Sequence, residues 1–160
     1  MLTVVLRFAS LFLTALLVGT MFGIWLGFNP AGLSAGAYIE MQQSTIRSLN
    51  VALPSLGAVC IVLTIALAVV TKNNRRARWL LILATLCLVG AGLITRFGNQ
   101  PINAVVMTWS VQAPASNWAE LRDMWWQLHI FRTALAVFGF ALALVAAVGI
   151  RISHTPTNAD

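Results

Sequence analysis

The side chains best suited to acid-base chemistry share one stripe of a predicted helix. Arg122, Trp125, His129 and Arg132 are separated by three, four and three residues, which places all four on one helical face. Histidine ordinarily titrates at about pH 6.5, so His129 is a candidate proton acceptor, and flanking arginines disfavour its charged form. Arg132 and Arg122 are candidates to stabilise an enolate. A histidine that is simply hydrogen-bonded inside a helix bundle is the alternative.

Arg132 is the most informative of these residues because it directly precedes the apolar run 133–150. An arginine at this depth needs a carboxylate, a carbonyl or a ligand if it faces other helices, and it must snorkel if it faces lipid. Three alternatives follow. Arg132 forms an ion pair with Glu40, it faces a cavity and binds an anionic or enolate-like ligand, or it snorkels.

Other polar and aromatic residues are candidates for binding a substrate. Asn99 and Asn103 flank Pro101 in an Asn-x-Pro-x-Asn motif, which we expect to form a compact turn. They would either orient a ligand or cap helix ends. Trp118 and Trp125 would wall a flat aromatic ligand or belong to an interfacial aromatic belt.

Composition shows what must hold these residues in place. The 160 residues are 59% hydrophobic and only 9% charged, with a mean hydropathy of +0.86. Soluble domains contain about 25% charged residues, so we expect an integral membrane protein that contacts the lipid bilayer. The net charge of +6 is dispersed along the chain, which argues against nucleic acid as a partner. A metal site is not expected, because few ligands lie near His129.

Apolar runs and helix signals predict an all-α fold, an integral membrane four-helix bundle formed by a single domain, residues 1–160. An extended fourth helix and a short interfacial helix between the first two are part of this prediction. The four membrane helices are expected at 5–28, 52–71, 77–95 and 117–152, the interfacial helix at 35–49, and a disordered tail at 154–160. In the interfacial helix, Tyr38, Met41, Thr45 and Leu49 can share a face, and Tyr38 and Gln42 either point into a site or are solvated.

Two stripes of small residues predict close helix packing. Gly19, Gly23 and Gly27 recur every fourth residue in the first helix, and a second stripe in the fourth helix contains Ala136, Gly139, Ala143 and Ala146. Cys60 and Cys87 lie near the middle of apolar segments, at a depth where they could touch. We expect them to behave as small apolar residues.

Charge predicts the orientation in the membrane. Lys72, Arg75, Arg76 and Arg78 lie between the second and third apolar segments, and positively charged connections remain in the cytoplasm. Four crossings then place both termini in the cytoplasm and the polar candidates on the outer side. We expect a bacterial inner membrane or a plasma membrane.

The order of these features resembles the anthrone oxygenase family of small membrane proteins. The residues that carry the resemblance are Gly19, Gly23, Tyr38, Met41, Gln42, Asn50, Arg96, Asn99, Pro101, Asn103, Trp118, Leu121, Arg122, Trp125, His129 and Arg132. The resemblance implies four membrane helices and, from the fungal branch of the family, oxidation of polyketide anthrones to anthraquinones by molecular oxygen. Molecular oxygen would be a co-substrate, and no organic cofactor is implied.

Together, the residues and the resemblance suggest a mechanism. His129 would remove a proton from a flat, lipophilic phenolic or quinol-type substrate, and Arg132 and Arg122 would stabilise the enolate, which then gives an electron to oxygen. Arg122, Trp125, Asn99, Asn103, Tyr38, Gln42 and Trp118 would bind the substrate. The alternative is a non-catalytic membrane module or complex subunit that binds a quinone, a lipid, a partner helix or a second copy of the chain.

Overall fold

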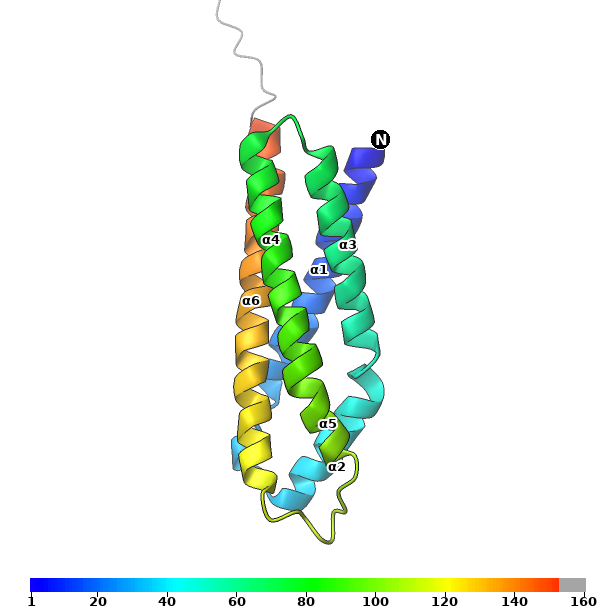
Figure 1. The fold of residues 1–160 in the computed structure, drawn as a ribbon, viewed down its shortest axis with the longest axis vertical. Helices are drawn as coiled ribbons and strands as arrows, with labels where there is room; N and C mark the ends of the chain where they lie inside the picture. The colour runs from blue at the N-terminus through cyan, green and yellow to red at the C-terminus, as the bar shows by residue number, and fades with distance from the viewer. Residues whose placement is uncertain (153–160) are drawn as a thin grey trace, which may run out of the picture.

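The computed structural model describes residues 1–152, and in this range the chain forms helices and no strands. Four long helices make an elongated bundle (Figure 1). They are α1 (Leu2–Gly27), α3 (Ala52–Val70), α4 (Arg75–Ile94) and α6 (Trp118–Ile152). The all-α bundle is confirmed, and its four spans are long and apolar enough to cross a membrane, so the protein is an integral membrane protein. The predicted tail, 154–160, lies outside the described residues.

Local polar groups define where several helices begin and end. The side chain of Asn74 accepts a hydrogen bond from the Ala77 backbone N–H, at 3.0 Å, and so caps the start of α4. Asn29 caps the short 3-10 turn η1 (Pro30–Gly32), which follows α1. These caps satisfy backbone donors that the first turn of a helix leaves without partners.

The two ends of the bundle differ in composition and structure. The basic connection between α3 and α4 lies at the same end as the N terminus and the end of α6, whereas α2 (Ala35–Leu49) and α5 (Gln100–Val106) lie at the opposite end (Figure 1). We call these the basic end and the α2 end. Which end faces the cytoplasm stays a prediction from the charge pattern.

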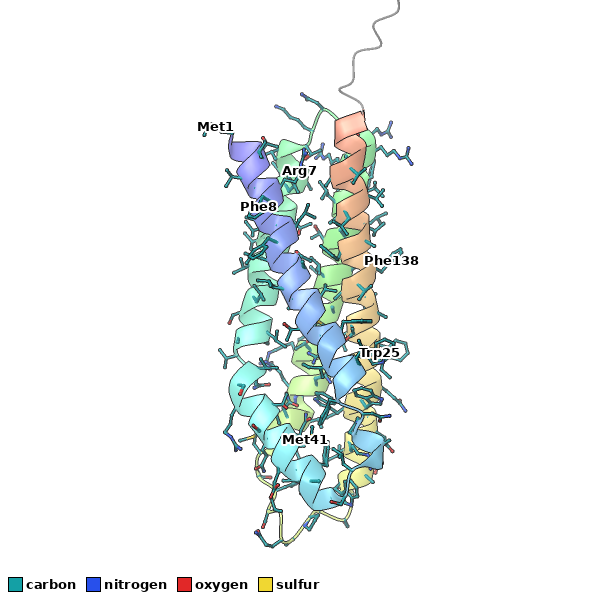
Figure 2. All side chains as sticks on the ribbon, turned by 180° about the vertical axis from the view of Figure 1, so that it is seen from behind. Met1, Arg7, Phe8, Trp25, Met41 and Phe138 are labelled. Carbon is teal, nitrogen blue, oxygen red and sulfur yellow. The ribbon has the colours of Figure 1, made fainter. Side chains whose placement is uncertain are left out.

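Helix α2 closes its end of the bundle with a face that differs from the predicted one. Its buried residues are Tyr38, Ile39, Gln42 and Ile46, whereas Met41, which we expected on the same face as Tyr38, is 43% exposed and lies on the outside (Figure 2). Tyr38, Gln42 and Ile46 recur every fourth residue, so they form one helical stripe. Met41 does not belong to this stripe, so the prediction that it shares a face with Tyr38 was wrong.

The third membrane span does not end in a turn. Helix α4 continues through a π-helical turn, η2 (Thr95–Asn99), into α5, so the Asn-x-Pro-x-Asn motif is helical and the predicted turn is wrong. Pro101 lies in the first turn of α5, where proline is tolerated. Single π turns inside helices are frequent at functional sites, and this one carries Thr95 and Asn99.

The two stripes of small residues behave differently. In α6, Ala136, Ala143 and Ala146 are buried, and a Cβ atom on Gly139 would lie 3.1 Å from the Ala84 carbonyl oxygen of α4. The predicted close packing is therefore confirmed for this stripe. In α1, Gly19, Gly23 and Gly27 have no neighbouring atom within 4 Å of a built Cβ, so the predicted close contact is not formed within the described chain.

The outer surface of the bundle suits a membrane. Large apolar side chains such as Phe8, Trp25 and Phe138 project from it (Figure 2). Cys60 is buried among apolar residues of the core, and both Cys60 and Cys87 are free thiols. Cys60 therefore packs as the small apolar residue that we expected.

Candidate functional site

His129 and Arg132 form a buried pair on the inner face of α6. The Arg132 guanidinium donates from Nε and Nη2 to Nδ1 of His129, at 3.2 and 3.0 Å. On the other side of the ring, Nε2 lies 3.2 Å from the Met21 carbonyl oxygen of α1. A carbonyl oxygen only accepts hydrogen bonds, so Nε2 carries the proton and His129 is neutral.

This pairing limits what His129 can do. Its side chain is fully buried, its donor is used by Met21 and its lone pair by Arg132. The indoles of Trp125 and Trp126 also lie nearly parallel to the imidazole, with ring centroids 5.2 and 5.6 Å away. A catalytic base needs a free lone pair within reach of the substrate. The role of His129 as a base therefore stays a prediction that requires Arg132 to release Nδ1.

Arg132 is a buried cation without a carboxylate partner among residues 1–152. Its exposed fraction is 8%, and its third hydrogen bond runs from Nη1 to Thr95 Oγ1, at 3.1 Å. Glu40 lies on the exposed side of α2, and no ion pair joins it to Arg132 in the described part of the chain, so this alternative was wrong. Snorkelling is excluded because the guanidinium is bonded inside the bundle.

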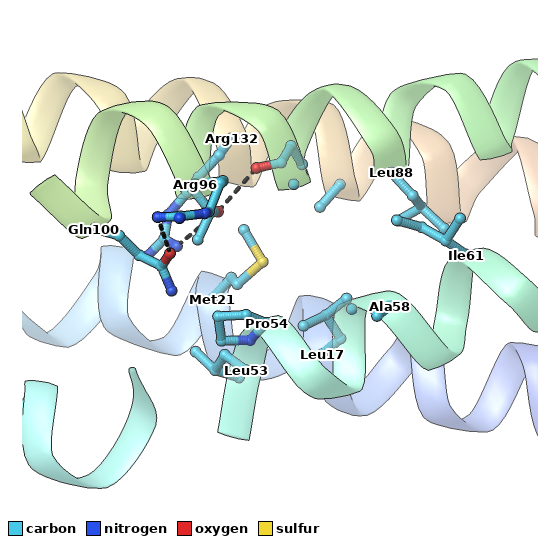
Figure 3. A pocket seen from close by; sticks show the side chains of 15 residues that line it. Leu17, Met21, Leu53, Pro54, Ala58, Ile61, Leu88, Arg96, Gln100 and Arg132 are labelled. Carbon is cyan, nitrogen blue, oxygen red and sulfur yellow. Dashed lines mark hydrogen bonds between the residues drawn. The ribbon is translucent and has the colours of Figure 1, made fainter. Parts of the chain in front are cut away.

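Cavities lie on two sides of Arg132. One, of about 200 Å³, lies between α1, α3, α4 and α6, and its wall is largely apolar, with Leu17, Met21 and Leu53 among the residues that line it (Figure 3). We call it the Arg132 cavity. A guanidinium has five N–H groups, and three are used by His129 and Thr95. Two N–H groups therefore remain for a ligand oxygen.

The second cavity is small, and several polar side chains line it. It measures about 30 Å³ and is lined by Gln42, Asn103, Thr95 and Arg132 among others. The Oε1 atom of the fully buried Gln42 has no hydrogen-bond partner, and a buried acceptor without a partner is costly. The cavity is large enough for a single water molecule. It can therefore hold one small donor beside Gln42.

Asn103 connects α5 with three other parts of the site. Its Oδ1 atom accepts hydrogen bonds from Trp125 Nε1, at 2.8 Å, and from Gln42 Nε2, at 3.4 Å. Its amide donates to Asn50 Oδ1, at 2.8 Å. Asn99 in turn donates to the Trp125 carbonyl oxygen, at 3.0 Å. Both asparagines thus hold protein groups in place in this structure.

Arg122, Trp118 and Tyr38 form a separate cluster at the α2 end. Arg122 binds Asp123, at 2.8 Å, and its guanidinium lies 4.8 Å from the Trp118 ring centroid. Trp118 contacts Tyr38, with ring centroids 6.2 Å apart. Burial raises the pKa of Tyr38 to about 12, partly offset by Arg122, so the phenol is neutral at physiological pH. Arg122 therefore contacts Asp123 and Trp118 and does not join the pair of His129 and Arg132, although it shares their helical stripe.

The family comparison agrees with this arrangement. A family described as anthrone oxygenase matches residues 41–142, which include Gln42, Asn103, His129 and Arg132 and cover more than half of the chain. The chain belongs to the anthrone oxygenase family. Comparisons with curated proteins and with solved structures gave no match.

In this anthrone oxygenase family member, sequence reasoning missed two residues that line the Arg132 cavity. Thr95 accepts a hydrogen bond from Arg132, and Gln100 lies at the cavity beside Arg96. Both are polar residues at the end of the third apolar segment, and this position was the available signal. A turn was expected at 99–103, so Gln100 was not expected to face the bundle, whereas Thr95 was predicted to be the last residue of the third membrane helix.

Proposed function

We propose that the protein is a membrane-embedded oxygenase that oxidises a flat, lipophilic phenolic or quinol-type substrate with molecular oxygen and without an organic cofactor. The observation that carries this proposal is Arg132, a buried cation with no carboxylate partner, beside a largely apolar cavity. Such a cation stabilises an oxyanion that develops in an environment of low dielectric constant. Membership of the anthrone oxygenase family supports this chemistry.

The reaction would proceed through an enolate. Loss of a proton from the acidic carbon leaves its electron pair delocalised onto the substrate oxygen, which accepts hydrogen bonds from Arg132. The enolate then gives one electron to oxygen, and the two radicals combine to form a carbon-oxygen bond. Loss of water from the resulting peroxide converts the CH₂ group to a carbonyl, so one oxygen atom stays in the product and the other leaves as water.

His129 would act as the base only after Arg132 has moved. A substrate carbonyl that binds the two remaining N–H groups of the guanidinium would draw Arg132 toward the cavity and away from Nδ1 of His129. Once released, Nδ1 regains the lone pair that accepts the proton. Substrate binding would thus activate the base, and the neutral tautomer held by Met21 is the form that this step requires.

Oxygen consumption tests the proposal directly. Purified protein in lipid nanodiscs is mixed with anthrone, while an oxygen electrode follows oxygen uptake and absorbance follows anthraquinone. We expect Arg132→Gln to reduce turnover by at least about 100-fold, since loss of one oxyanion donor typically costs that much. Arg47→Gln, at an exposed position on α2, is the matched control and should keep full activity. Equal turnover in both variants contradicts the proposed role of Arg132.

A second candidate function is supported by the glycine stripe on α1. Gly19, Gly23 and Gly27 are exposed and have open space around them, as expected for a helix that packs closely against a partner helix in the membrane. In this case the protein would be a subunit of a membrane complex or a homo-oligomer. Crosslinking through a Gly23→Cys variant in native membranes tests it, and a purely monomeric product argues against it.

A further inference from the structure

We infer that ligands reach Arg132 directly from the lipid phase, through an opening between α3 and α4, and that Arg96 and Gln100 select lipophiles with an acidic headgroup at this opening. This inference rests on the proposed function for the identity of the Arg132 cavity as the ligand site. It adds the route of access and the charge of the ligand, neither of which requires catalysis.

The exposed residues of the cavity wall locate its opening. Most lining residues are buried or half-buried, but Ala58 of α3, Gly92 of α4 and Arg96 of η2 are exposed. All three border the gap between α3 and α4. Figure 3 shows Arg96 and Gln100 across the cavity from Pro54 and Leu53. The Arg132 cavity therefore opens sideways from the bundle.

Small residues keep this opening clear, and lipid-facing residues surround it. Ala58 and Gly92 have no long side chain to cover the cavity, and a Cβ on Gly92 would reach only ordinary contact with Ile61, at 4.0 Å. Beside the opening, Val59 and Leu93 are exposed by 46% and 54%. Exposed apolar residues on a membrane helix face acyl chains, so the opening faces the bilayer interior.

The alternative route, past α2, is narrow, because the second cavity beside Arg132 measures only about 30 Å³. Tyr38, Ile39, Gln42 and Val106 are fully buried at the α2 end. Gln43 donates hydrogen bonds to the carbonyl oxygens of Val106, the last residue of α5, and of Trp109 just after it, both at 3.0 Å. These contacts join α2 to α5 at the α2 end of the bundle. A ligand from water would have to break them, whereas a ligand dissolved in lipid would not.

Charge defines the ligand. Arg96 at the opening and Arg132 inside are both cations, and no aspartate or glutamate lines the cavity. Gln100, the first residue of α5, donates a hydrogen bond to the Asn50 carbonyl oxygen, at 3.4 Å, and accepts one from Arg96, at 3.5 Å. The cavity volume of about 200 Å³ is below the roughly 300 to 1,000 Å³ of typical ligand pockets. It fits a small ring system with one phenolate or enolate oxygen, not a two-chain phospholipid.

Binding kinetics in a bilayer test the route. The protein is placed in vesicles of neutral phospholipid and mixed with vesicles that contain 2-hydroxyanthraquinone, above the pKa of its phenol, and quenching of tryptophan fluorescence reports binding. Ala58→Phe and, from the opposite helix, Gly92→Leu cover the opening. We expect either variant to slow both association and dissociation by at least about ten-fold, because access gates set such rates. Val62→Phe, one turn away on α3 and 64% exposed, is the matched control and should change neither rate.

The charge selection has its own test with the neutral analogue 2-methoxyanthraquinone. Arg96→Gln should slow association of the phenolate by about five-fold and leave association of the methoxy compound unchanged.

Three results would each overturn the inference. The first is unaltered rates in both Ala58→Phe and Gly92→Leu, the second is an equal slowing by Val62→Phe, and the third is no binding to the wild-type protein. If binding follows the expected pattern but anthrone is not oxidised, the oxygenase proposal fails and the route stands. If anthrone is oxidised and covering the opening changes nothing, the route fails and the oxygenase proposal stands.

Discussion

Two halves of the same face of α6 meet α4 in different ways. Toward the basic end, Gly139 and the small residues around it let α4 approach so closely that the Ala84 carbonyl oxygen would lie 3.1 Å from an added Cβ. Toward the α2 end, the same face carries Trp125, His129 and Arg132, and it meets η2, the continuation of α4, through hydrogen bonds from Arg132 to Thr95 and from Asn99 to the Trp125 carbonyl oxygen. We call these the closed half and the open half of the α6 face.

The comparison shows that side-chain size along one stripe determines where a membrane bundle has a cavity. Helix packing in lipid depends on close contact between small residues, and the closed half provides it. In the open half, the stacked rings of Trp125 and His129 and the long side chain of Arg132 take the place of small residues, and the Arg132 cavity lies beside them. Ala136 lies at the boundary and lines the Arg132 cavity. A tightly packed half thus supports a half that leaves room for a ligand.

Filling the closed half should have the largest effect on stability. Gly139→Leu forces a side chain into the contact with Cys87 and Ala84, and overpacking of this kind costs about 3 kcal/mol or more. Unfolding by SDS in mixed micelles, followed by circular dichroism, measures the change. Gly23→Leu is the matched control, because nothing lies within 4 Å of its Cβ position. Similar losses in the two variants would show that α4 and α6 are not in close contact.

Breaking the pair in the open half should have the next largest effect. His129→Leu leaves Arg132 buried without its main acceptor, which costs about 2 to 3 kcal/mol. Arg132→Met removes the charge itself, so the double variant should be more stable than His129→Leu alone. A double-mutant cycle on SDS unfolding measures this coupling. Strictly additive losses would mean that the bond between Arg132 and His129 does not form.

The sequence predicted the closed half better than the open half, for a physical reason. Close packing depends on residue size and period, and the buried positions of Ala143 and Ala146 follow directly from their spacing. The all-helical fold and the burial of Trp125, His129 and Arg132 could be predicted in the same way. These features depend on one helix at a time.

The open half depends on contacts between helices, which the spacing on one helix does not contain. The partner of Arg132 is His129 on its own helix, not Glu40, and this depends on how α2 rotates against the bundle. Gln100 lies at the Arg132 cavity because α4 continues through a π turn into α5, where a turn was predicted. Arg122 forms an ion pair with Asp123, its immediate neighbour, and does not contribute to the site around Arg132.

Removing one hydrogen bond from the open half should have a smaller effect. Trp125→Phe deletes the bond from the indole N–H to Asn103 Oδ1, while Gln42 still donates to that atom. We expect a loss of about 1 kcal/mol in thermal unfolding. Trp126→Phe is the control, because this half-buried indole also stacks on His129 but does not donate to Asn103, whose Oδ1 atom accepts from Trp125 and Gln42. A larger loss of stability from Trp126→Phe would mean that ring stacking on His129, and not the hydrogen bond from Trp125 to Asn103, stabilises the open half.

The smallest effect at neutral pH should come from Tyr38, which closes the open half at the α2 end. Its hydroxyl has no hydrogen-bond partner, so Tyr38→Phe should leave stability near neutral pH unchanged. Tyr38 is the only tyrosine, so the absorbance of tyrosinate reports it alone, with an expected midpoint of about 12 instead of 10. The unfolded chain loses this proton near pH 10 while the folded chain keeps it, so stability should be constant below pH 10 and fall between pH 10 and 12. Tyr38→Phe should remove this part of the pH dependence, and a titration midpoint near 10 would mean that water reaches the ring and the end is not sealed.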